Sequence, residues 1–309
     1  MPVKGHPQFQ ERFQVYVLGP NQDSRLASVA AGQRLEVDLT LDPDAPFRLT
    51  GRAVRQKYTA ALTQNGLQFL STRYTGQYGT EDYRQQDLVN VACEMPNFGQ
   101  AGCPRSIWPQ SVYGPKSVIR VDLQNNGASA ITNLTLFFFG VKIFPWGAVQ
   151  GYTYPERFSS QAYSWQLPVS NLGVNERRPN QMFTVNQVDF VLRAGQATAP
   201  FQIGGTRTFA EVGIVLKDEQ RKPYMNDFVP LDILFGAGGF PSVIPLGPTP
   251  SYIAPFGPGP GNPGLIYPEI YVPYSHQLFY DLQRSDGTGG TNQAESFTIN
   301  LVGSRIYPQ

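Results

Sequence analysis

The amino-acid sequence predicts an all-β protein made of two tandem β-sandwiches that arose by internal duplication. The 309 residues include 31 glycines and 27 prolines, which interrupt the chain too often for long helices. No stretch keeps a 3.6-residue apolar period, whereas several short stretches alternate polar and apolar residues as strands do. Four pairs of similar segments also recur in the same order. A chain of this length can bury two separate cores.

The clearest pair of segments comprises 131–145 and 294–308. Each begins with the polar and apolar alternation of a strand that has one buried face. In each, the apolar positions change parity at a glycine, Gly140 or Gly303, and the segment then ends in proline. A one-residue shift at a strand glycine is typical of a β-bulge. We therefore predict bulges near Gly140 and Gly303, at equivalent places in the two sandwiches.

Three further pairs of segments precede these closing strands. They are 37–41 with 188–192, 45–51 with 199–205, and 117–124 with 276–283. A shared all-β composition could produce one or two such pairs, but four in the same order favour duplication. They predict an N-terminal arm and first strand (1–36), a first sandwich (37–145), an inter-domain connection (146–187) and a second sandwich (188–309). The irregular stretches are predicted at 58–115, with a short helix within 81–91, and at 236–268.

The charge and apolar patterns exclude several function classes. A net charge of +1 argues against a surface that neutralises many phosphates, so we expect no sequence-specific nucleic-acid binding. The longest basic run, Arg177-Arg178, is expected in a solvated loop. The N-terminus lacks a signal-peptide core, and the most apolar run, 134–144, is too short to span a bilayer and contains Lys142. We expect synthesis in a cytoplasm and no membrane insertion.

The sequence supplies few groups for catalysis or metal binding. Cys93 and Cys103 are expected to be free thiols, or a local disulfide formed after release from the cell. Two histidines, His6 and His276, are too few for a histidine-rich metal site. No Gly-x-Ser-x-Gly elbow or phosphate-binding glycine loop is present. The sequence therefore predicts no catalytic, cofactor-binding or metal-binding residue, and a protein that is not an enzyme.

Two sets of residues remain as candidates for a role. Asp122 and Asp281 occupy equivalent places in the two repeats, and we expect them to end equivalent strands as turn-forming groups rather than to act as paired catalytic carboxylates. The aromatic residues of the predicted connection could stack on sugars or bases, but burial at an inter-domain or inter-subunit contact is the favoured interpretation. They are Tyr152, Tyr154, Tyr163 and Trp165.

A duplicated all-β chain with few charges and long Pro/Gly loops resembles the double jelly-roll major capsid proteins of tailless icosahedral viruses and phages. The resemblance covers about 37–308 and rests on architecture, because no diagnostic motif accompanies the repeat. It implies two jelly rolls per subunit, homotrimeric pseudo-hexagonal capsomers, and contacts with neighbouring capsomers, minor capsid proteins and an internal membrane surface. It also implies a place in the virion, with the loops at 58–115 and 236–268 forming towers or inter-subunit contacts.

Three functions fit these observations. The first is the major capsid protein. The second is another phage structural component, such as a head decoration, vertex, neck or tail protein. The third is a carbohydrate-binding or carbohydrate-cleaving protein with two β-sandwich domains.

Overall fold

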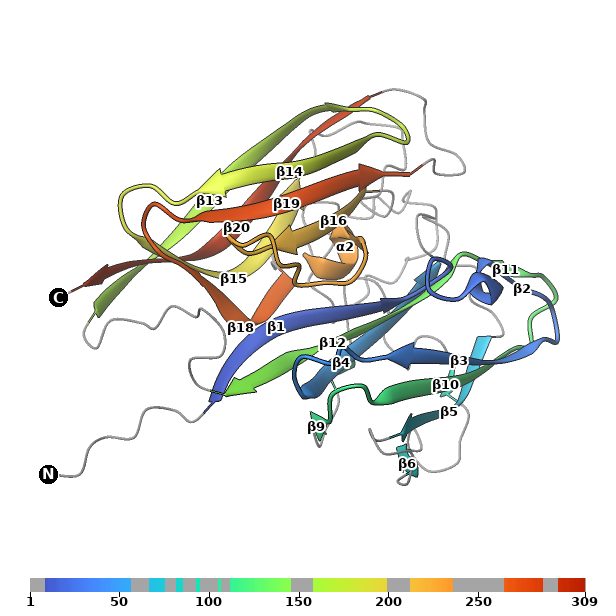
Figure 1. Ribbon diagram of the computed structural model, residues 1–309. Coiled ribbons are helices and arrows are strands. Elements are labelled where there is room, and N and C mark those ends of the chain that lie inside the picture. The colour runs from blue at the N-terminus through green and yellow to red at the C-terminus, as the bar shows by residue number, and fades with distance from the viewer. Residues whose placement is uncertain are drawn as a thin grey trace, which may run out of the picture.

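The computed structural model describes residues 9–56, 67–75, 82–85, 93–94, 105–106, 112–145, 158–198, 212–235, 264–285 and 294–308. These residues form two β-sandwiches, one from each half of the chain, and the all-β prediction is confirmed (Figure 1). The helices among them are two single turns, η1 (Ser24–Ala27) and α2 (Leu231–Leu234).

Two facing sheets make up the first sandwich. One has the order β1-β12-β4-β8, with β9 also pairing β4; its strands are β1 (Phe9–Leu18), β12 (Leu134–Pro145), β4 (Phe47–Gln56), β8 (Arg105–Ser106) and β9 (Val112–Tyr113). The other has the order β3-β10-β5-β6, with β7 also pairing β5; its strands are β3 (Arg34–Thr40), β10 (Val118–Asn125), β5 (Leu67–Thr75), β6 (Asp82–Gln85) and β7 (Cys93–Glu94). A small ribbon joins β2 (Ser28–Val29) to β11 (Ile131–Thr132).

The second sandwich repeats this plan with eight strands in two sheets. One sheet has the order β13-β20-β15-β18, from β13 (Phe158–Leu172), β20 (Glu295–Pro308), β15 (Asp189–Thr198) and β18 (Gly264–Val272). The other has the order β14-β19-β16-β17, from β14 (Arg177–Thr184), β19 (Gln277–Arg284), β16 (Val212–Lys217) and β17 (Val229–Pro230). Each strand therefore has a counterpart in the first sandwich with the same neighbours.

The strand pairing shifts the repeat away from the boundaries expected from the sequence. The first sandwich begins at β1, before residue 37, and the segment expected as a connection, 146–187, supplies β13 and β14 of the second sandwich. Consequently β3 corresponds to β14 and β4 to β15. The expected match of 37–41 with 188–192 therefore joined strands that are not equivalent. The expected match of 45–51 with 199–205 cannot be compared, because 199–205 lies outside the described residues. The helix expected within 81–91 is also wrong where it can be compared, because 82–85 is strand β6.

Both predicted bulges are present, and in each the additional residue belongs to the neighbouring strand. Opposite Gly140, the pairing of β12 with β4 skips Thr50, and opposite Gly303, the pairing of β20 with β15 skips Arg193. A Cβ at Gly140 would overlap the carbonyl oxygen of Arg48, and a Cβ at Gly303 would overlap that of Val191. Only glycine fits, because the bulge brings the next strand's backbone against the Cα atom.

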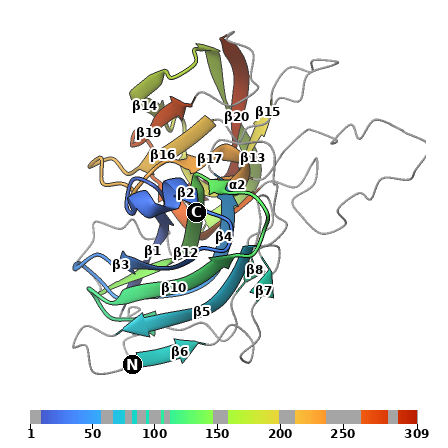
Figure 2. The same ribbon diagram turned by 90° about the vertical axis from the view of Figure 1, so that its right-hand side faces the viewer.

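The sheet that contains β1, β12 and β4 is buried on both faces. It lies between the other sheet of its own sandwich and the second sandwich, as both views show (Figures 1 and 2). Phe138 points into the core of the first sandwich, whereas the adjacent Phe137 belongs to the apolar cluster shared with the second half. The Phe137-Phe138-Phe139 run is therefore continuous because consecutive residues of a strand face opposite cores.

Candidate functional site

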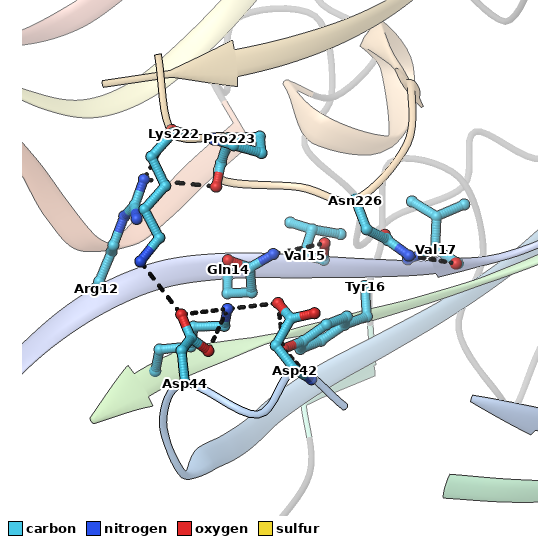
Figure 3. A network of polar contacts seen from close by, with 11 residues as sticks. Arg12, Gln14, Val15, Tyr16, Val17, Asp42, Asp44, Lys222, Pro223 and Asn226 are labelled. Atoms are coloured by element: carbon cyan, nitrogen blue, oxygen red, sulfur yellow. Dashed lines mark hydrogen bonds and ion pairs between the residues drawn. The ribbon is translucent and has the colours of Figure 1, made fainter. Parts of the chain in front are cut away.

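The contact between the two sandwiches is the most elaborate polar arrangement that the structure describes. We call it the seam: the outer edge of β1 against segment 218–226 of the second half. The backbone N–H of Val15 donates to the carbonyl of Tyr224 at 2.9 Å. Asn226 makes a reciprocal pair with Val17, accepting from its N–H at 2.6 Å and donating to its carbonyl at 3.0 Å (Figure 3). The seam thus provides hydrogen-bond partners for backbone groups on the outer edge of β1, which would otherwise be a free sheet edge.

Arg12 fixes one end of the seam. The residue is 6% exposed, and its guanidinium forms an ion pair with Asp218 at 2.9 Å and donates to the carbonyl of Lys222 at 2.8 Å. Its guanidinium carbon lies 4.5 Å from the centre of the Tyr224 ring. Burial raises the pKa of Tyr224 to about 12, so this phenol stays neutral beside the arginine. A buried arginine with an anion and carbonyl acceptors holds two segments in one register.

Lys142 is the centre of the second ionic cluster at the seam. This lysine, 3% exposed, contacts Asp42 Oδ2 at 2.5 Å and Asp44 Oδ1 at 2.9 Å. Lys222 of the second half reaches the same Asp44 at 3.2 Å (Figure 3). Burial opposes ionisation of Asp44, but the hydrogen bond and charge of Lys142, with a smaller contribution from Lys222, lower its pKa overall. The Tyr16 hydroxyl also donates to Asp42 at 3.0 Å. Cations from both halves therefore share one carboxylate.

Asp122 and Asp281 are equivalent in the structure, but not as turn-forming groups at strand ends. Both lie within strands, β10 and β19, and both are buried. Arg34 donates to Asp122 at 2.9 Å, and its counterpart Arg177 lies 3.5 Å from Asp281. Lys217 adds a contact to Asp281 at 2.8 Å. Burial raises the pKa of Asp281, but the Lys217 hydrogen bond and further partners outweigh it and lower the pKa. The prediction of turn-forming groups is corrected to a duplicated ion pair across each sheet.

A shallow pocket of about 120 Å³ opens beside the seam, between β1, β18 and the start of β19. Its walls carry several carboxylates, each with a basic side chain as partner: Glu11 with Arg48 at 2.8 Å, Glu269 with Arg193 at 2.8 Å, and Glu219 with the Nδ1 atom of His276. Among the residues that the structure describes, no three histidine, cysteine or carboxylate side chains gather closely enough to hold a metal ion.

The other residues singled out from the sequence have varied outcomes. Tyr163 and Trp165 lie in β13 and pack inside the second sandwich, where Trp165 contacts Phe183 at a ring separation of 5.1 Å. Arg177 and Arg178, expected in a solvated loop, lie in edge strand β14 and make ion pairs. Cys93 lies in β7. Four residues lie outside the described residues: His6, Cys103, Tyr152 and Tyr154.

Of the charged residues in the seam and in the adjoining Lys142 cluster, the sequence singled out Lys142 alone. The ion pairs there join residues about 100 or 200 positions apart, such as Lys142 with Asp42 and Arg12 with Asp218. The one available signal was a lysine within an otherwise apolar strand, which requires a buried partner.

No protein-family model matches the chain, and no curated protein matches it either. Solved structures do match over nearly its whole length. One is PNGase F, a glycosylasparaginase from Flavobacterium meningosepticum, with 11% identity and a TM-score of 0.23; the match covers 96% of this chain and 97% of that one. Another is a peptide-N(4)-(N-acetyl-β-D-glucosaminyl) asparagine amidase, with 10% identity, a TM-score of 0.23 and coverage of 94% and 96%. A third is the CUB1-EGF-CUB2 domain of human MASP-1/3, with 8% identity, a TM-score of 0.17 and coverage of 97% and 100%.

The first two of these matches correct one expectation from the sequence. They are enzymes, so the prediction that this chain is not an enzyme is contradicted, and we withdraw it. At TM-scores of 0.23 the likeness carries no residue, substrate or reaction over to this chain.

Within the described ranges, no helix is long and apolar enough to cross a bilayer.

Proposed function

We propose that this chain is a virion shell protein built as a double jelly roll, and specifically a major capsid protein that forms trimeric, pseudo-hexagonal capsomers of an icosahedral shell. The observation that carries the proposal is the strand order. Numbered from one to eight, the strands of the second sandwich form sheets 1-8-3-6 and 2-7-4-5, and their counterparts in the first sandwich follow the same order. This order supports the proposal, because jelly rolls, which include viral capsid domains, consist of eight antiparallel strands in two sheets.

The seam supports a structural role for the pair of sandwiches. Apolar residues of β1 and β12 join the two halves in one cluster, and buried ion pairs fix their register. Two domains held in this way act as one rigid block, unlike domains that move about a polar linker. A block of two equivalent units suits a lattice in which three chains present six similar positions.

The implied partners are other copies of the chain, neighbouring capsomers and minor capsid proteins, with an internal membrane surface as a further contact. The implied location is the virion after synthesis in a host cytoplasm. A net charge of +1 favours contacts between proteins over broad phosphate neutralisation, so no sequence-specific nucleic-acid partner is proposed.

Measurement of particle mass and shape tests the proposal. We expect purified protein to elute with a light-scattering mass of three times 34.2 kDa or larger, and electron micrographs to show pseudo-hexagonal particles. A monomer at every concentration would contradict the proposal. Recovery as a minor component of a tailed particle would instead support another phage structural part, such as a decoration, vertex, neck or tail protein.

A second candidate function is a carbohydrate-binding or carbohydrate-cleaving protein with two sandwiches. The pocket beside the seam favours it, because Glu219 and Glu269 line one opening, and paired carboxylates are the usual groups of glycoside hydrolysis. Glycan-array binding and hydrolysis of oligosaccharides, compared between wild type and the Glu219→Gln and Glu269→Gln variants, test it. Equal signals in wild type and both variants would exclude this pocket as the site.

A further inference from the structure

Strands β1 and β13 are equivalent edge strands with different surroundings. β1 pairs with β12 so that Gln14 lies opposite Gly140, and β13 pairs with β20 so that Tyr163 lies opposite Gly303. The outer edge of β1 is covered by segment 218–226 of the second half. Among the described residues, no strand pairs with the outer edge of β13. One copy of the repeated unit therefore has a covered edge, and the other has an open one.

The residue types on the two outer faces differ in the same way. Phe13, Val15 and Val17 of β1 face the second sandwich and are buried. The residues at the equivalent positions of β13 are Ala162, Ser164 and Gln166, and all three are exposed. On the adjoining strands, Phe137 and Phe139 of β12 correspond to Asn300 and Val302 of β20. The first face is a dry internal contact. The second face carries small or polar side chains, as expected of an interface that also meets water.

The backbone direction at the open edge follows from the same register. Val15 directs its N–H away from β12 to the carbonyl of Tyr224, so Ser164, its equivalent, directs its N–H away from β20. Pro168, which lies on the same exposed side and has the same parity, agrees with this, because proline is tolerated in a strand where its nitrogen would face solvent. The outer edge of β13 thus offers hydrogen-bonding groups at alternate residues from 162 onward.

We propose that the outer edge and face of β13 bind the first sandwich of a second copy of this chain, in the manner in which β1 binds the second sandwich within the chain. The contact is head-to-tail: the second unit of one copy meets the first unit of the next, and repetition of one such contact closes a ring when the rotation permits. This inference rests on the proposed shell function, which supplies closure after three copies. The exposed polar face makes assembly reversible, whereas the apolar seam keeps each subunit intact.

Backbone and surface variants of Ser164 test the interface. Ser164→Pro removes the outward N–H without removing a bond to β20, so the monomer should keep the wild-type melting temperature. Association, measured by analytical ultracentrifugation, should weaken at least about tenfold, since the partner's acceptor is left unpaired. Ser164→Ala, which keeps the N–H, is the matched control and should assemble like wild type. Ser164→Lys, which adds bulk and charge without changing the backbone, decides the question if the proline variant does not fold.

The outcomes separate this inference from the proposed function. The β13 interface is supported if Ser164→Pro and Ser164→Lys lose assembly while Ser164→Ala keeps it. Slowed amide exchange of residues 162–166 in the assembled wild type supports it as well. If both variants form trimers as wild type does, the β13 interface is wrong while the shell function stands. If wild type remains a monomer at every concentration, both proposals fail.

Discussion

Gly140 and Gly303 each lie so close to a neighbouring strand that a side chain has no room. Each faces the carbonyl oxygen of a bulged neighbouring strand, and the ring of Phe47 or Phe190 lies beside the same Cα atom. We expect Gly140→Ala and Gly303→Ala each to destabilise the protein by about 3 kcal/mol, because the new methyl group must displace backbone. Urea unfolding measures the change.

Gly114→Ala is the matched control for these two substitutions. Its new Cβ would meet the Ser117 hydroxyl oxygen at 3.7 Å, an ordinary contact. We expect a change within about 0.5 kcal/mol. If Gly140→Ala is equally mild, the bulge is not as tight as described.

Asp44, which pairs with Lys142, should make stability depend on acid pH. The pKa of Asp44 is lowered in the folded protein, so its contribution is complete above the ordinary aspartate pKa, about 3.9, and is lost as the pH falls from there toward the folded value. Chemical unfolding between pH 6 and pH 2.5 should show this decline for wild type, and a shallower decline for Asp44→Asn. Identical slopes for the two proteins would contradict the assignment.

Some residue environments followed from the sequence and others did not. The glycine at each parity change correctly marked the place of a bulge, although β12 and β20 themselves keep an unbroken register there with β1 and β13. The sequence pattern could not show that Thr50 and Arg193 are the additional residues, since bulge position depends on pairing with another strand. Asp122 was aligned correctly with Asp281, but its partner Arg34 lies 88 residues earlier, so no local pattern revealed the ion pair.

At the scale of elements, β12 is the strand on which both cores depend. Phe137 and Phe138 are equally buried, yet they face different clusters. Phe138→Ala should lower the stability of the first sandwich by about 3–5 kcal/mol. Phe137→Ala should cost a similar amount, but it weakens the contact between the halves. We therefore expect scanning calorimetry to show a broader or divided transition for Phe137→Ala only, and a divided transition for Phe138→Ala would reverse this assignment.

The element-level errors of the sequence alignment have a common physical origin. Alternation of polar and apolar residues recurs in every half-buried strand, so the short segments 37–41 and 188–192 look alike although they belong to non-equivalent strands. Turn geometry identifies the correct alignment better. Ala30 to Gln33 and Gly173 to Glu176 form the same turn, with positive φ at Gly32 and Asn175, and the side chain of Gln33 or Glu176 accepts from the first residue's N–H.

At the scale of the whole molecule, duplication explains the fold better than it explains the site. Equal units gave a sound expectation of two sandwiches, because each must bury a core of its own. The seam was not predicted, since it exists only where the units differ: apolar residues on the outer face of the first sandwich and polar residues at the equivalent places of the second. Comparison of equivalent positions, rather than of each position alone, reveals such a contact.

The same comparison predicts how the halves behave when they are separated. Residues 1–145 expressed alone should be poorly soluble and bind an apolar dye, because the outer face of β1 and β12 loses its cover. Replacing five apolar residues of this face by the residues at the equivalent positions of the second sandwich should restore solubility. The substitutions are Phe13→Ala, Val15→Ser, Val17→Gln, Phe137→Asn and Phe139→Val. Conservative replacements at the same five positions, which keep the face apolar, are the control and should leave the fragment insoluble. Sedimentation and dye fluorescence measure both. A soluble, dye-free wild-type fragment would show that the two halves do not depend on the seam, because the first sandwich would then be complete without it.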